Sequence, residues 1–158
     1  MIHHLPKSLA LSALTAACAL LPALGTAATF KWSSASDIPT LDIHSQNNAL
    51  GNGVHAAIYD SLVYYNSKTF KVEPRLATGW KELSPTQVRF SLRTGVKFSD
   101  GTDLTADDVV FSLQRAMAKT SNFQVYTQGF KTVNKVDART VDIVLSGPNP
   151  VLINQLTE

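Results

Sequence analysis

Cysteine is nearly absent from this sequence, because its single copy, Cys18, lies within the first 28 residues. Without that segment the chain has no thiol, which excludes disulfides and cysteine chemistry in any compartment. Clusters of basic residues are also missing. Removing Lys7, the one charged residue of that first segment, from the 14 basic residues leaves 13, against 12 acidic residues. A net charge near +1 without charge blocks argues against a nucleic-acid or membrane-surface partner.

The motifs of common enzyme classes are lacking as well. No serine lies in a Gly-x-Ser-x-Gly elbow, and no glycine-rich phosphate loop occurs. After the first segment the only histidines are His44 and His55, which do not have the spacing of a zinc site. The adjacent acids Asp107 and Asp108 are expected in the first turn of a helix, where negative charge is stabilising. The sequence therefore predicts no catalytic site, no cofactor and no metal centre.

The first 27 residues are typical of a secretory signal peptide. A weakly positive start at Lys7 precedes a largely apolar run, 9–24, which is followed by small residues. We expect cleavage after Ala27 or Ala28 and export to the periplasm. An uncleaved membrane anchor is the alternative, but the run is short and interrupted for a membrane span. A lipid anchor at Cys18 is disfavoured, because the leucine before it stands one place too far upstream.

The most regular pattern of the chain begins with a strand and a turn. Apolar and polar residues alternate over 88–92, as in a strand with one buried face. Gly95 breaks this alternation, which resumes over 96–98 and predicts a second short strand. The Asp-Gly pair at 100–101 then predicts a turn, because glycine tolerates positive φ and aspartate bonds to the nearby backbone.

A capped helix is expected directly after this turn. Thr105 is a favoured N-cap residue, and Asp107 and Asp108 follow where the helix dipole attracts negative charge. An apolar face then recurs at helical spacing. Its members are Val109 or Val110, Leu113 and Met117. The two aspartates are therefore interpreted as helix-stabilising rather than as a reactive carboxylate pair.

The rest of the chain alternates irregularly between strands, helices and hairpins. This pattern predicts an α/β class, mixed α+β, with a mixed sheet. The remaining expected elements are a strand at 29–33, a loop at 36–42, a helix from about Val54 to Leu62, a strand at 63–65, a loop at 120–130 and a hairpin at 133–145. The last residues, 150–158, read as the beginning of a further helix.

A segment rich in amides and glycine, 46–53, precedes the helix expected at Val54. Such residues favour turns and leave backbone N–H groups available to a ligand. Together with its position after the first expected strand, this composition predicts a contribution to a ligand cleft. The predicted ligand-binding residues are His44, Asn47, Asn48, Gly51 and Asn52. For His44 a polar loop or surface role without ligand is the competing interpretation.

Three stretches together carry a resemblance to a known family. They are "VEPRLATGW" at 72–80, "FSLRTGVKFSDGTDLTADDVVFSLQR" at 90–115 and "VNKVDARTVDIVLSGPNP" at 133–150. The compound pattern resembles the extracytoplasmic solute-binding proteins of family 5, the peptide, dipeptide and nickel receptors of ABC importers. One departure is Leu41-Asp42-Ile43, where that family usually has Leu-Asp-Pro.

The resemblance implies a periplasmic-binding-protein-like lobe. Such receptors hold a small solute, most often a short peptide, between two lobes and deliver it to ABC permease subunits in the inner membrane. The resemblance also implies that the full-length protein is a monomer. Residues 28–158 would then be the N-terminal part of the solute-binding domain, a fragment without its second lobe. The family's partner for a peptide amino terminus would lie beyond Glu158, and Trp80 would be a core residue.

Two other functions remain open at the level of sequence. One is a receptor for a non-peptide solute, such as a nickel chelate, an opine or an oligosaccharide. The other is a periplasmic signalling or chaperone-like protein that binds without transport. Aromatic side chains often stack on ligands in solute receptors, so Trp32, Tyr64 and Tyr65 are candidates for ligand contact as well as for packing.

Overall fold

The computed structural model describes residues 29, 31, 33–34 and 37–157. The chain divides into two units, Met1–Ser36 and Asp37–Glu158, and every described helix and strand belongs to the second. The predicted signal peptide lies outside the described residues. So do Phe30 and Trp32. Thr29, Lys31 and Ser33, the described residues of the strand predicted at 29–33, are in no strand.

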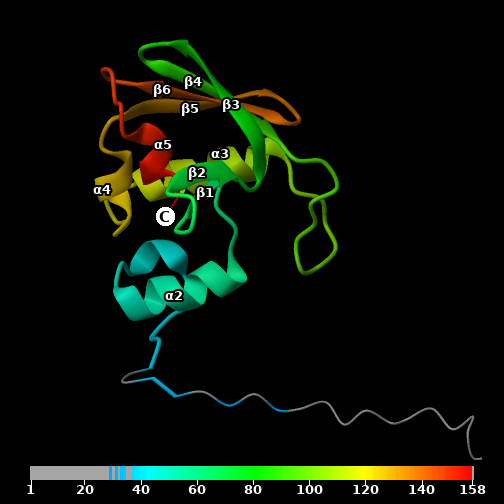
Figure 1. The fold of residues 1–158 in the computed structure, drawn as a ribbon, viewed down its shortest axis with the longest axis vertical. Helices are drawn as coiled ribbons and strands as arrows, with labels where there is room; N and C mark the ends of the chain where they lie inside the picture. The colour runs from blue at the N-terminus through cyan, green and yellow to red at the C-terminus, as the bar shows by residue number, and fades with distance from the viewer. Residues whose placement is uncertain (1–28, 30, 32, 35–36, 158) are drawn as a thin grey trace, which may run out of the picture. The chain divides into compact units, whose positions relative to one another are not determined.

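The centre of the second unit is a four-stranded antiparallel sheet (Figure 1). Its strands are β3 Ala77–Ser84, β4 Gln87–Leu92, β5 Phe130–Asp137 and β6 Thr140–Leu145. They lie in the order β3-β4-β6-β5, so two hairpins are joined through β4 and β6. Phe90 is thereby paired with Val141, and Val88 with Ile143. The segment between β4 and β5 leaves the sheet and returns to it.

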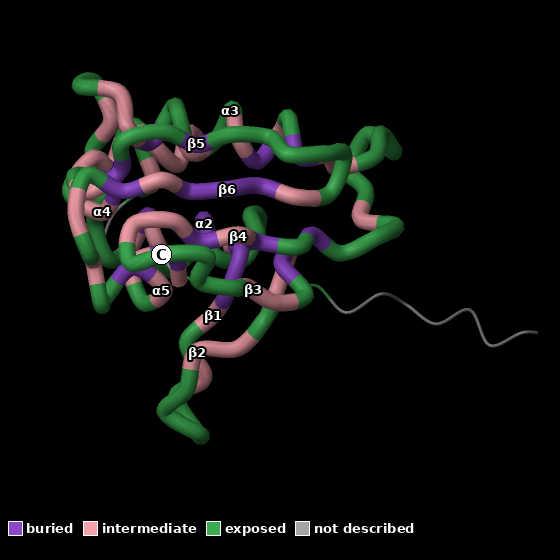
Figure 2. Tube along the Cα trace, turned by 90° about the horizontal axis from the view of Figure 1, so that it is seen from above, coloured by how far each residue is buried: buried purple, intermediate pink, exposed green. Residues whose placement is uncertain are grey.

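One face of this sheet forms the core. The alternating residues Val88, Phe90 and Leu92 of β4 are buried, as are Val141 and Ile143 of β6. Figure 2 shows this burial concentrated along the two central strands. Since side chains on a strand point alternately to opposite faces, period-two alternation was sufficient to identify β4 and its buried side. The strand predicted at 88–92 is confirmed.

The opposite face of the two central strands carries a charged pair. Asp142 of β6 is buried and accepts hydrogen bonds from Nε of Arg89 at 2.7 Å and from Nη2 of Arg89 at 2.8 Å. Gln87 Nε2 donates to the same carboxylate at 2.9 Å. These bonds satisfy a carboxylate that would be costly to bury alone. They also join two strands that are distant in sequence.

Helix α3, Ala106–Met117, packs against β5 and β6. Asp108 Oδ2 accepts hydrogen bonds from the backbone N–H and the hydroxyl of Thr105, each at 2.8 Å. Val109 is buried, and the rest of the predicted apolar face packs against the core. The helix, its N-cap and its apolar face are therefore confirmed. Asp108 has the helix-stabilising role that the sequence predicted.

Smaller elements surround this sheet and helix. Strands β1 Val63–Asn66 and β2 Lys71–Pro74 form a separate antiparallel hairpin, which agrees with the predicted strand at 63–65. Two short helices follow later, α4 Gln124–Thr127 and α5 Leu152–Gln155. Trp80 is half-buried and packs against the core, 6.5 Å from Phe90 between ring centroids, which confirms its predicted packing role.

Helix α2 corrects the predicted boundaries most clearly. It spans Ala49–Ile58, whereas a helix from about Val54 to Leu62 was expected. It begins early because Asn48 Oδ1 accepts a hydrogen bond from the Gly51 N–H at 2.8 Å and so caps its first turn. It ends at Ile58, because the backbone of the next residue, Tyr59, is extended. Most of the amide-rich segment expected as a loop is therefore helical.

Three further expectations need correction. Residues 96–98 form no strand, and Lys97 makes only an isolated bridge to Asp103, because the chain turns back tightly at 100–101. The loop expected at 120–130 contains α4. Every strand pair among the described residues is antiparallel, so the mixed sheet is not found there, although the mixed α and β class is confirmed. Hairpin turns join most neighbouring strands, which makes them antiparallel.

Candidate functional site

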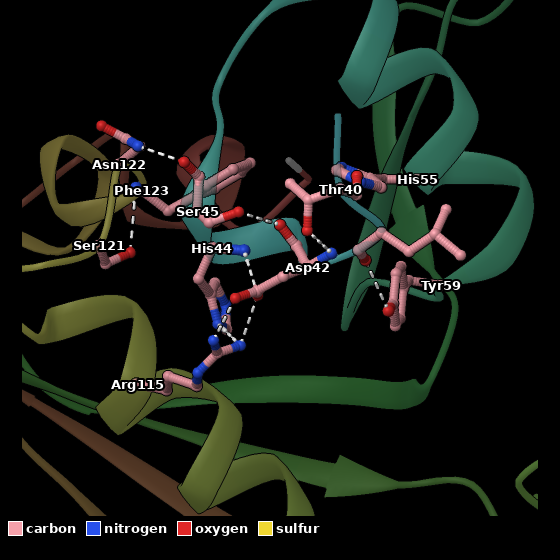
Figure 3. Close-up of polar contacts among 11 residues, drawn as sticks. Thr40, Asp42, His44, Ser45, His55, Tyr59, Arg115, Ser121, Asn122 and Phe123 are labelled. Carbon is pink, nitrogen blue, oxygen red and sulfur yellow. Dashed lines mark hydrogen bonds and ion pairs between the residues drawn. The ribbon is translucent and has the colours of Figure 1, made fainter. Parts of the chain in front are cut away.

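The segment that leads into α2 is joined to α3 and α4 by a polar network (Figure 3). This segment contains a short 3-10 helix, η1 Ile43–Ser45, which Asp42 caps. Asp42 Oδ1 accepts a hydrogen bond from the His44 N–H at 3.1 Å. Asp42 thereby stabilises the local backbone, independently of its contact with α3.

Arg115 of α3 binds the same carboxylate with both ends of its guanidinium. Nη1 donates to Oδ1 of Asp42 at 2.6 Å and Nη2 donates to Oδ2 at 2.5 Å. These bonds hold the pKa of Asp42 below its ordinary value. Nη1 of Arg115 also lies 3.2 Å from Nδ1 of His44. Burial, followed by the positive charge of Arg115, lowers the pKa of His44 and favours its neutral form.

Asn122, just before α4, binds the backbone of η1 and so joins the network to α4. Its backbone N–H donates to the His44 carbonyl at 2.9 Å, and its side chain donates to the Ser45 carbonyl at 2.5 Å. The His44 ring also meets Phe123 edge-on, with 6.0 Å between ring centroids. Polar contacts therefore hold η1 against α3 and α4.

The five predicted ligand-binding residues lie close together along this segment and the first turns of α2. Asn47 Oδ1 accepts a hydrogen bond from Asn52 Nδ2 at 2.9 Å, and Asn47 Nδ2 lies 3.4 Å from the Asn122 carbonyl. The Asn48 side chain caps α2 through Gly51, which is buried. A Cβ at Gly51 would lie 3.3 Å from Asn48 Oδ1. All five are thus engaged by other residues of the same segment, by α2 itself or by Asn122.

A cavity of about 550 Å³ lies beside the network. Its wall comes from η1, the end of α2, the 96–104 loop, α3, α4 and α5. Most of the lining is apolar, with separate polar groups on His44, Lys97, Ser112 and Gln155. Ligand pockets in proteins combine an apolar wall with a few polar groups in this way. His44 is the one predicted site residue that lines this cavity.

Sequence reasoning did not identify Arg115 and Asn122 as members of the network. Each is separated from its partners by more than seventy residues. Nothing in the local pattern of α3 distinguishes Arg115 from other basic residues on an exposed helix face. The sequence did give some indication for Asp42, because aspartate favours turns, where its side chain accepts a hydrogen bond from the backbone N–H two residues further on. Only the fold brings these groups together.

The described residues contain neither a metal-binding cluster nor a membrane-spanning helix. In the described part of the chain, no three His, Cys, Asp or Glu side chains are placed to hold a metal ion. No helix within residues 37–157 has the length and apolar character required to cross a membrane. Among the aromatic candidates, the Tyr64 hydroxyl donates to Glu73 at 2.5 Å, while Tyr65 is exposed.

Comparison with known proteins identifies the family. Residues 71–158, more than half of the chain, match the model of the bacterial extracellular solute-binding proteins, family 5. The chain belongs to this family. The family membership expected from the three sequence stretches is therefore confirmed.

Individual relatives support the same assignment. The structure of AgaA from A. tumefaciens R10, in complex with agropinic acid, is 31% identical with a TM-score of 0.70, covering 77% of this chain and 25% of that one. The periplasmic murein peptide-binding protein MppA of Escherichia coli K12 is 34% identical over 61% of this chain and 21% of its own. The transcriptional regulator SgrR of Escherichia coli strain 536 is 34% identical over 63% of this chain and 18% of its own. The chain thus spans a quarter or less of each relative.

Proposed function

We propose that this chain is part of the substrate-binding receptor of an ABC importer and that its solute is a short peptide. The observation that carries the proposal is the family match over residues 71–158. Similarity to MppA, which is named for binding murein peptide, favours a peptide as the solute. The cavity beside His44 supports the proposal, since it combines an apolar wall with separate polar groups.

The proposed mechanism is closure of two lobes around the solute. Contacts that both lobes make with the solute exist only in the closed state, so binding shifts the population toward closure. The closed receptor then docks on membrane permease subunits. His44 is the leading contact on this chain, because it lines the cavity and Arg115 and Asn122 hold its position. Binding, with no catalytic step, is the proposed activity.

The proposal includes a location. The protein is exported through the cleaved leader at 1–27 and acts as a monomer in the periplasm. The family's extracellular character supports this placement. N-terminal sequencing of the protein recovered from a periplasmic extract tests it directly: a start near Ala28 is expected, and recovery only in the membrane fraction with Met1 retained would contradict it.

The function is tested by calorimetry on protein produced from its complete gene. Trialanine and agropinic acid are titrated into wild type, into His44→Gln and into Asn134→Ala, a control on the exposed side of β5. We expect trialanine to bind wild type and the control alike, and His44→Gln to bind about tenfold more weakly, as for the loss of one hydrogen bond in a buried site. No heat with trialanine would contradict the peptide proposal.

A non-peptide solute is the second candidate. It is favoured by the similarity to AgaA, whose structure contains agropinic acid. Binding of agropinic acid, and not of trialanine, in the same titrations would select this candidate. Mass spectrometry of solute that purifies with the protein provides an independent identification.

A further inference from the structure

His55 of α2 is buried, yet one of its ring nitrogens has no partner. The residue is 1% exposed, and its Nε2 lies 3.4 Å from the carbonyl oxygen of Thr40. Its Nδ1 contacts no donor or acceptor within the described part of the chain. A carbonyl only accepts, so the contact with Thr40 requires hydrogen on Nε2. Nδ1 is then a buried acceptor that lacks a donor.

A second buried acceptor without a hydrogen-bond donor lies about one helical turn away. Asn52 Oδ1 is buried and has no partner among residues 37–157, while its Nδ2 donates to Asn47 Oδ1. Exchanging the oxygen and nitrogen of this amide would bring two oxygens together as long as Asn47 keeps its orientation, which its own Nδ2 contact with the Asn122 carbonyl at 3.4 Å favours. Residues three apart on a helix share a face. Asn52 and His55 therefore present two unsatisfied acceptors on one side of α2.

Both residues line a small pocket. Its volume is about 130 Å³, and its wall also includes Tyr59, Phe123 and the ion pair of Asp60 with Arg75. This volume is on the order of ten water-sized spheres, which suits one side chain and not a whole peptide. Oδ1 of Asp60 and Nη2 of Arg75 are 2.5 Å apart, so this ion pair brings no net charge to the rim. What Nδ1 of His55 and Oδ1 of Asn52 lack within this pocket is a hydrogen-bond donor.

We propose that this pocket is a specificity subsite that receives an amine- or hydroxyl-bearing side chain of the bound solute. Its N–H or O–H groups donate to Nδ1 of His55 and Oδ1 of Asn52. Unsatisfied buried acceptors are costly, so a solute that supplies donors gains affinity over one that leaves the acceptors unpaired. The inference rests on the proposed function, because it assigns part of a solute to this pocket.

The test uses three tripeptides with side chains of matched length. Ala-Lys-Ala, Ala-hydroxynorleucine-Ala and Ala-norleucine-Ala end in an ammonium, a hydroxyl and a methyl group, and are titrated calorimetrically into protein from the complete gene. We expect at least one donor peptide to bind about tenfold more tightly than the norleucine peptide. His55→Phe and Asn52→Leu should each remove this difference, and the exposed control Asn134→Ala should retain it.

A second readout reports on the pocket without any peptide. Nitrogen NMR of the His55 side chain is recorded while n-butylammonium chloride or n-butanol is added, with n-butane-saturated buffer as the apolar control. A donor that reaches Nδ1 shifts its resonance, and Asn52→Leu should weaken the shift. Equal affinity for the three peptides overturns the inference and leaves the peptide proposal intact. If no tripeptide binds, the peptide proposal fails, and an unmoved His55 resonance overturns the inference as well.

Discussion

The Asn48 side chain caps helix α2, although Asn48 belongs to the segment predicted to bind ligand. It was expected to contact solute, and its Oδ1 accepts from the Gly51 N–H while its Nδ2 donates to Gln46. A capping side chain cannot turn to a solute without leaving the first turn of α2 unsatisfied. Its role in binding stays a prediction, and it has to be separated from its role in folding.

Two substitutions of Asn48 separate these roles. Asn48→Ala removes the cap and should lower the free energy of unfolding by about 1 kcal/mol. Asn48→Asp keeps an acceptor for the Gly51 N–H and should remain within a few tenths of a kcal/mol of wild type, on the order seen between good N-cap residues. Urea denaturation measures both. Equal destabilisation by the two variants would show that the cap seen at Gly51 contributes little.

Solute affinity of the same variants completes the comparison. Aspartate lacks the side-chain N–H group of asparagine, so Asn48→Asp tests that donor at nearly constant stability. If Asn48→Asp binds the solute with wild-type affinity, the Asn48 amide N–H does not contribute to binding. A loss of affinity would show that it does.

At the scale of the element, α3 illustrates how neighbouring acids differ. Asp108 bonds the backbone and the hydroxyl of Thr105, whereas Asp107 points to an exposed contact with Lys135 at 2.6 Å. Adjacent residues of a helix point in different directions, so only one of the pair can reach back to the N-cap. The same helix carries Arg115 near its end, which places the network on a rigid element.

Alanine substitutions should reveal this difference. Asp108→Ala leaves the N–H of Thr105 without its acceptor and should destabilise the protein by about 1 kcal/mol, as for other capping losses. Asp107→Ala loses an exposed ion pair and should stay within about 0.5 kcal/mol of wild type. Thermal and urea unfolding of the two variants, compared side by side, measure the effect. A larger loss for Asp107→Ala would contradict the assignment of the cap.

At the scale of the whole molecule, stability depends on joining two hairpins that form far apart in the chain. Pairing of β4 with β6 buries Phe90 against Val141 and brings Arg89 to Asp142. Hydrogen bonds from Arg89 are the main reason that the pKa of Asp142 lies below its ordinary value. The charged form of Asp142 is therefore favoured by folding itself.

This shift predicts a loss of stability in acid. Because the pKa of Asp142 is lower in the folded state, its contribution is complete above the unfolded value of about 3.9 and decreases as the pH falls through the folded value. Asp142→Asn cannot ionise, so it should be less stable than wild type at pH 7, and the gap should close as the pH drops below about 4. Urea midpoints across this range measure the gap. A gap that does not vary with pH would contradict the predicted linkage.

Several elements could be predicted from local sequence patterns alone. Period-two alternation identified β4, the Thr105 cap and apolar spacing identified α3, and the Asp-Gly pair at 100–101 identified a turn. Each signal acts within one element, where side-chain direction follows directly from backbone geometry. The family followed from the same stretches, because several local patterns occurred together in one order.

Tertiary structure decided how those elements meet and which residues are near a candidate site. The order β3-β4-β6-β5, the contact of Asp42 with Arg115 and the burial of His55 all join groups far apart in the chain. Contacts of this kind depend on packing and loop closure over many residues, and a local pattern carries no record of its distant partner.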